Sequence, residues 1–141
     1  MLVAAVLLFL SSTVAVWWLV GQQTLDDVAD PDFAVRPWDI PRGVERAVGA
    51  GSFVTLAGTV PLFVDWTLTR RMDPVWWSAL GPLLGAGAAA AVGHRVVTAE
   101  VIGANIGGGF VVLVGMPVVA LVGVMGLGRA VQLALRGRRR G

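Results

Sequence analysis

Four long stretches of the sequence contain no charged residue, and they constrain the fold more than any other feature. They cover residues 1–25, 47–64, 75–94 and 101–128. A helix needs about 17–25 apolar residues to cross a hydrocarbon core about 30 Å thick, and each stretch is long enough. A soluble domain of 141 residues has too little interior for a chain that is 56% hydrophobic and only 14% charged. We therefore expect a bilayer to surround the chain.

The apolar stretches are expected to be helical. Within lipid, only helices and closed β-barrels satisfy their own backbone hydrogen bonds. Barrel strands are about 10 residues long and alternate polar with apolar side chains, which residues 111–126 (VVLVGMPVVALVGVMG) do not do. The sequence therefore predicts an all-α fold, a polytopic transmembrane helical bundle with about four spans. We expect a single membrane domain over residues 1–141, with spans at about 2–20, 47–65, 75–94 and 102–128.

The segments between the expected spans differ in character. Residues 21–46 form the one sizeable connector, and its three prolines argue against a continuous helix there. Residues 65–73 suffice for a turn, after which Asp73 and Pro74 predict a helix start, with Asp as the cap and Pro at the first position. Residues 129–141 form a basic tail. Tryptophans lie near the span ends, as in the aromatic belt of membrane proteins: Trp17, Trp18, Trp66, Trp76 and Trp77.

The distribution of arginine predicts the orientation. All eleven basic residues are arginines. With four spans, the turn at 65–73 and the tail share one side and hold seven of them, whereas the other side holds four. Cytoplasmic loops are enriched in basic residues, so both termini are expected in the cytoplasm, with the 21–46 connector outside. Arginine without lysine, together with abundant Ala, Gly and Val, is typical of GC-rich bacterial genomes. We therefore expect a multi-pass protein of the bacterial cell (inner) membrane.

Small residues in the spans predict close helix packing. Gly81 and Gly85 form one G-x-x-x-G pattern, and Gly103 and Gly107 form another. The missing side chains let helix backbones approach closely. Residues 86–93 are almost entirely Ala and Gly, and Gly49, Gly51 and Gly58 give the second span a similar face. The sequence therefore predicts tight packing within one chain, or against a membrane-protein partner or a second copy.

One candidate polar cluster lies around the turn between the third and fourth spans. It comprises His94, Arg95, Glu100 and Asn105. The last apolar stretch would be about 42 Å long as one helix, which exceeds the core, so we expect it to tilt or to break at glycines 107–109. Two interpretations remain open. The polar groups line a cavity at a broken helix, or they are interfacial residues, with Asn105 bonded to a neighbouring helix.

No catalytic, cofactor-binding or metal-binding residues are predicted, and we do not expect an enzyme. The chain has no cysteine and one histidine, no nucleotide-binding loop and no visible nucleophile–base pair. The basic tail is too short for a nucleic-acid surface. We therefore expect an accessory, anchoring or scaffold protein whose partners are the lipid bilayer and a membrane protein or a second copy. The alternatives are a small homo-oligomeric transporter or channel, and a holin-like membrane-lesion protein.

Overall fold

The computed structural model describes residues 1–22, 33–101 and 105–138, which are almost wholly helical. Its elements are α1 (Leu2–Val20), α2 (Arg42–Leu68), η1 (Pro74–Trp76), α3 (Trp77–Val97), α4 (Ile106–Phe110), η2 (Val111–Gly115) and α5 (Met116–Arg138). In this part of the chain, four helices are long and apolar enough to cross a membrane. The third consists of η1 and α3, and the fourth consists of α4, η2 and α5. The predicted all-α fold with about four spans is confirmed.

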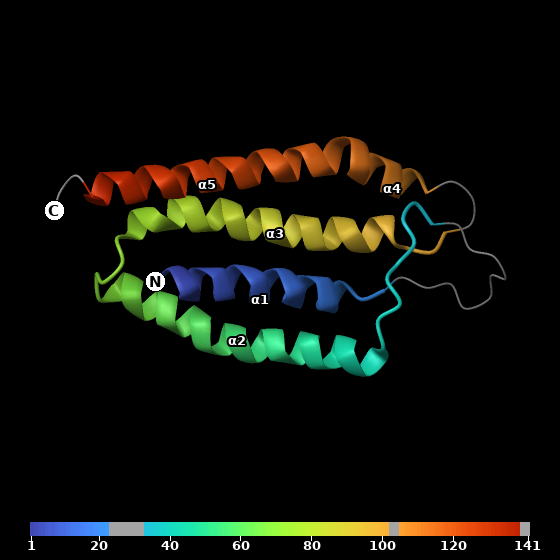
Figure 1. Cartoon of the computed structure of the whole chain (residues 1–141), viewed down its shortest axis with the longest axis horizontal. Coiled ribbons are helices and arrows are strands. Elements are labelled where there is room, and N and C mark those ends of the chain that lie inside the picture. The colour runs from blue at the N-terminus through green and yellow to red at the C-terminus, as the bar shows by residue number, and fades with distance from the viewer. Residues whose placement is uncertain (23–32, 102–104, 139–141) are drawn as a thin grey trace.

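The four long helices lie side by side in one row, in the order α2, α1, α3, α5 (Figure 1). The extensive contacts join α1 to α2, α1 to α3, and α3 to α5. The two outer helices therefore each have one main neighbour, and the last span exposes nearly all of its apolar side chains. Such exposure is costly in water and favourable among lipid tails.

Both ends of the described chain lie at the same end of the row (Figure 1). Residue 1, the turn between α2 and α3, and the end of α5 are found there, whereas residues 33–41 and residues 98–101, which follow α3, lie at the opposite end. We call these the terminal end and the connector end of the molecule. An even number of spans requires this arrangement.

The turn at the terminal end forms as the sequence predicts. The Asp73 carboxylate accepts a hydrogen bond of 2.9 Å from the backbone N–H of Val75, and Pro74 occupies the first helical position. Proline has no N–H to leave unpaired there, and its fixed φ suits a first turn. At the connector end, α2 begins directly after Pro41, five residues before the expected span. The helices thus extend beyond the apolar stretches into charged sequence.

The last span is helical at glycines 107–109, where the sequence left a break open as the alternative to a tilt. These residues lie inside α4, and Asn105 caps that helix by accepting a 2.6 Å hydrogen bond from the Gly108 N–H. The irregularity falls later, in the π-helical segment η2 immediately before Met116 and Pro117. Proline lacks an N–H and its ring clashes with the carbonyl four residues earlier, so a wider turn relieves the conflict. The helix then continues into the basic tail as far as Arg138.

Each pair of neighbouring helices has a glycine at its close approach. A Cβ atom at these positions would come within 3.0 Å of the adjacent helix: Gly49 against Trp18, Gly87 against Thr13 and Phe9, Gly126 against Leu83. Side chains of the neighbouring helix can lie this close only where a side chain is missing. The glycines thus fix where the four helices touch.

Tryptophans contribute to packing at both ends of the row. Trp18 lies against Gly49 and makes an edge contact with Phe53, with ring centroids 5.8 Å apart. At the terminal end, the Trp77 indole N–H donates a 3.0 Å hydrogen bond to the Thr67 hydroxyl. The fully buried Phe63 packs between the rings of Trp66 and Trp77. These side chains therefore join helices as well as lying near the span ends.

Candidate functional site

The most distinctive polar feature is a buried arginine at the connector end. Arg95 is 3% exposed, and each of its three guanidinium nitrogens donates a hydrogen bond. Nε donates to the Trp17 carbonyl at 2.9 Å, Nη1 to the Gln22 side-chain oxygen at 2.9 Å, and Nη2 to the Glu45 carboxylate at 2.6 Å. We call these residues, with the adjacent His94, the Arg95 cluster.

Three helices bring the Arg95 cluster together. Arg95 lies in the last turn of α3, Trp17 in the last turn of α1, and Glu45 in the first turn of α2. Both charges suit these positions, because a helix C-terminus favours a cation and an N-terminus favours an anion. The guanidinium also stacks on Trp17, with Cζ 3.7 Å from the ring centroid. An indole face is a favourable neighbour for a desolvated cation.

His94 extends the Arg95 cluster toward the surface. Its Nδ1 accepts a 3.2 Å hydrogen bond from the Trp17 indole N–H, which places Trp17 in contact with both neighbouring residues of α3. The imidazole also lies against the exposed Trp38, with ring centroids 5.4 Å apart. Trp38 comes from the segment that precedes α2. The histidine thus links α1, α3 and the described part of the connector.

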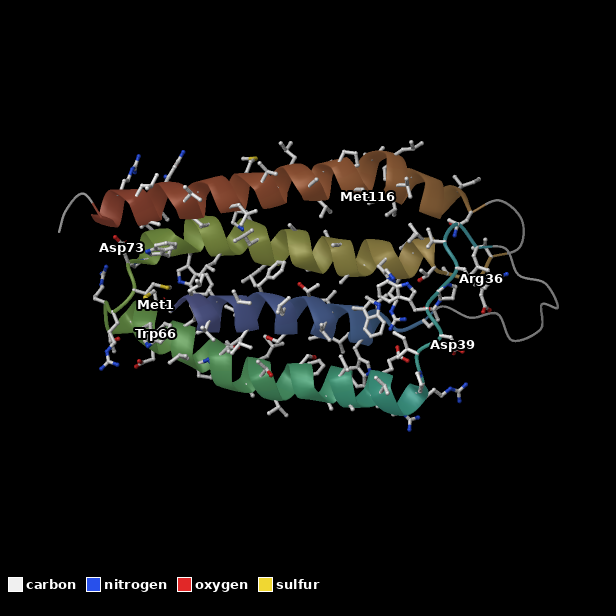
Figure 2. All side chains as sticks on the ribbon, in the orientation of Figure 1. Met1, Arg36, Asp39, Trp66, Asp73 and Met116 are labelled. Atoms are coloured by element: carbon white, nitrogen blue, oxygen red, sulfur yellow. The ribbon has the colours of Figure 1, made fainter. Side chains whose placement is uncertain are left out.

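The connector is bonded to α3 at further points. Gln22, which follows α1, donates a 2.6 Å hydrogen bond to the Thr98 carbonyl, and the Val35 N–H donates to the Val97 carbonyl at 2.9 Å. Thr98 and Val97 lie at the end of α3, where carbonyl groups lack partners within the helix. These bonds give partners to backbone carbonyls that the helix leaves unpaired at its end. Figure 2 shows Arg36 and Asp39 at this end of the molecule.

The chemistry of the Arg95 cluster is that of a structural cross-link. An unpaired buried guanidinium would be very costly, but here each nitrogen has an oxygen partner. Every buried side-chain nitrogen or oxygen in the described residues has a hydrogen-bond partner. The described residues contain no group of three or more His, Asp or Glu side chains able to hold a metal ion. Each guanidinium nitrogen is thus bonded within the chain, and these bonds join α3 to α1, to Gln22, which follows α1, and to α2.

The structure brings together only two of the four residues of the predicted polar cluster. His94 and Arg95 come together, but with Trp17, Gln22 and Glu45. Asn105 caps α4 and donates a 3.5 Å hydrogen bond to the Val96 carbonyl of α3, so its predicted bond to a neighbouring helix is present. Glu100 is half-buried in the link that follows α3. A functional role for these four residues remains a prediction.

The glycines predicted to pack helices also differ from one another. A Cβ at Gly81 or Gly85 would meet nothing within 4 Å, so neither approaches another helix of this chain. A Cβ at Gly107 would make ordinary contact with Val96, at 3.6 Å. Gly103 lies outside the described residues. Packing through Gly81 and Gly85 against another chain remains a prediction, whereas Gly87, from the same Ala/Gly-rich segment, forms the tight contact with α1.

Sequence reasoning missed Glu45 and Gln22 as partners of Arg95. The signal available was an arginine at the end of an apolar stretch, which needs a counter-ion when it is buried. Several carboxylates lie near that end of the spans in the sequence, Asp39, Glu45 and Glu100 among them. The choice between them depends on which helices are neighbours, and that is set by the tertiary arrangement.

Comparisons with known proteins add no relative: no family model matches the chain, and no curated protein or solved structure matches it either.

Proposed function

We propose that this protein is an accessory or scaffold component of a membrane assembly, which binds a partner helix through one exposed face of α3. The observation that carries the proposal is the position of Gly81 and Gly85. Both are exposed, and the space where their side chains would lie is open. Membrane helices associate through small residues that allow their backbones to approach, so an unoccupied glycine face is suited to a partner.

The proposed face has the spacing of one helix surface. Gly81, Gly85 and Ala89 are exposed and lie four residues apart, so they form one stripe along α3. At the start of the stripe, the Ser78 hydroxyl accepts a 3.0 Å hydrogen bond from Arg129 of α5. Gly87 points elsewhere, because it meets α1. Within the chain, α3 packs against α1 through Gly87 and against α5 through Leu83, and both contacts leave Gly81 and Gly85 uncovered. A partner helix can therefore pack there without displacing either neighbour.

The Arg95 cluster supports a structural role over a catalytic one. Each guanidinium nitrogen of Arg95 is bonded within the chain, and these bonds hold three helices at the connector end. A rigid row is a suitable scaffold, because a partner helix then meets a surface that is already ordered. The buried charge of Arg95 is thus explained by its partners within the chain, and no substrate is needed to explain it.

We also propose the bacterial cell membrane as the location, with both termini in the cytoplasm. The support is the excess of arginine at the terminal end, seven residues against four at the connector end. Because the chain has no cysteine, single thiols at Gly43 and Gly137 can be labelled selectively in intact cells. We expect an impermeant reagent to label the thiol at 43 and not the one at 137. The reverse pattern would invert the orientation.

The test of the proposed function is native mass spectrometry of the tagged chain, extracted with its lipids into nanodiscs. We expect a different membrane protein at fixed stoichiometry, lost in the double variant Gly81→Leu/Gly85→Leu. The matched control is Gly128→Leu in α5, where the added side chain also meets open space. A homo-oligomer lost in the double variant would favour the transporter or channel alternative. An assembly that both variants retain would refute the proposed face.

A further inference from the structure

A second surface of the row is a long apolar groove. It has a volume of about 670 Å³ and is bounded by α1, α3 and α5. Phe63 of α2 contributes to its wall, and Met72 and Trp76 line it near the α2–α3 turn. The groove differs from the glycine face, because its residues on α3, such as Leu80, Leu84 and Gly87, lie on other sides of the helix than Gly81 and Gly85.

The length of the groove limits what can occupy it. From Trp76 at the end of η1 to Ala90 of α3, its lining extends about 21 Å at the helical rise of 1.5 Å per residue. A spanning partner helix would need about 30 Å. The groove instead begins at the terminal end and is somewhat longer than one leaflet of the hydrocarbon core, which is about 15 Å thick. An acyl chain that enters from that interface fits this extent better than a helix.

The end of the groove is strongly basic. Arg70 and Arg71 directly precede Met72, which lines the groove, and both are exposed. By sequence, the terminal end carries seven arginines against two aspartates, Asp65 and Asp73. Trp76 lies at the same end, the depth at which indole rings meet lipid headgroups. An apolar groove that ends among arginines complements a molecule with an apolar chain and an anionic head.

The backbone at Arg70 gives an independent reason to consider its side chain. Arg70 has φ of 56°, and in the described chain it is the non-glycine residue with positive φ. Glycine would adopt this left-handed conformation with less strain, so the turn itself does not favour arginine. An outlier of this kind is a reason to ask what the side chain does. Arg70 is exposed and lies two residues before Met72, which lines the groove, so its guanidinium is available to an anion at that end.

We propose that the groove binds one acyl chain of an anionic membrane phospholipid, whose phosphate contacts Arg70 and Arg71. The apolar walls of α1, α3 and α5 hold the chain, and the arginines select the charge of the headgroup. This site does not rest on the proposed partner face, which lies on another side of α3. Either proposal can therefore fail without the other.

The experiment measures which lipid the purified chain retains. The protein in detergent is incubated with equal amounts of phosphatidylglycerol and phosphatidylcholine that carry the same acyl chains, and bound lipids are counted by native mass spectrometry. We expect one phosphatidylglycerol per chain. The double variant Arg70→Gly/Arg71→Gln should lower the preference for the anionic lipid by about five-fold for each arginine. The matched control, Arg42→Gln/Arg46→Gln, removes two exposed arginines at the connector end and should leave the preference unchanged.

A second pair of variants tests the groove itself. Ala90→Phe places a ring in the groove at an exposed position and should abolish retention of both lipids, whereas Val124→Phe on the exposed surface of α5 should not. Arg70→Gly relieves the strained turn, so its unfolding midpoint should not fall, and a loss of lipid cannot then be attributed to unfolding. An unchanged lipid preference in the arginine variant would overturn the proposal. Retention of lipid by the Ala90→Phe variant would also overturn it. A dimer without bound lipid that Ala90→Phe dissociates would overturn it too, since a second copy would then occupy the groove.

Discussion

Removing the Glu45 carboxylate tests whether the Arg95 cluster holds the helices together. Deleting one partner of a fully buried ion pair costs about 3–5 kcal/mol, because the remaining charge is left uncompensated. Here the Arg95 side chain is 4% exposed but that of Glu45 is 27% exposed, and Arg95 keeps its bonds to Trp17 and Gln22. Water can therefore replace part of the lost interaction. We expect Glu45→Ala to lower the free energy of unfolding by about 2–3 kcal/mol.

A conservative variant separates charge from hydrogen bonding. Glu45→Gln retains an oxygen that can accept from Nη2 of Arg95, so it should cost only about 1 kcal/mol. The assay is equilibrium unfolding in detergent by titration with dodecyl sulfate, followed by tryptophan fluorescence and far-UV circular dichroism. A double-mutant cycle with Arg95→Met, which keeps most of the side-chain volume, should give a coupling energy of about 1–2 kcal/mol.

The control for this prediction is Asp39→Ala, which removes an exposed carboxylate at the same end of the molecule. Surface changes of this kind usually alter stability by less than about 0.5 kcal/mol. If Glu45→Ala is as mild as the control, and its effect adds to that of Arg95→Met, the pair does not hold the helices and the reasoning is wrong.

Three further predictions use the same unfolding assay on the monomer. Gly87→Leu forces a side chain into α1 and should cost at least about 2 kcal/mol, whereas Gly85→Leu should cost under about 0.5; equal effects would contradict the assigned contacts. Trp17→Phe removes the donor to His94 and weakens the stacking on Arg95, so we expect a loss of about 1 kcal/mol, and full stability would argue against both contacts. Asn105→Ala removes the cap of α4 at a cost of about 1 kcal/mol, with faster amide exchange at Gly108; unchanged exchange would exclude the cap.

Much of the fold could be predicted from local properties of the chain. Apolar length decided how many helices are long enough to span a membrane, because a bilayer allows few other backbone conformations. The start of η1 followed from Asp73 and Pro74, whose capping geometry depends on neighbouring residues alone. The sequence left a tilt or a break at glycines 107–109 open, and these residues lie inside α4, because glycine permits a break without requiring one. Pro117 removes a hydrogen bond, and the irregular turn precedes it.

The candidate site shows where local reasoning ends. His94 and Arg95 stood out because polar residues at the end of an apolar stretch are unusual, but their partners come from α1 and α2, some 50 to 78 residues away. Likewise, the sequence marks many glycines without distinguishing Gly87, which meets α1, from Gly85, which faces outward.

The sequence by itself thus determined the number of long apolar helices and the sharing of one end by both termini, since these depend on apolar length and on the number of spans. The tertiary structure decided the order of the row, the burial of Arg95 beside Glu45, and which faces remain open. The physical reason is that lipid solvates any apolar helix face, so hydrophobicity cannot select neighbours. Close packing at glycines and a few buried hydrogen bonds make that selection, and both depend on residues far apart in the chain.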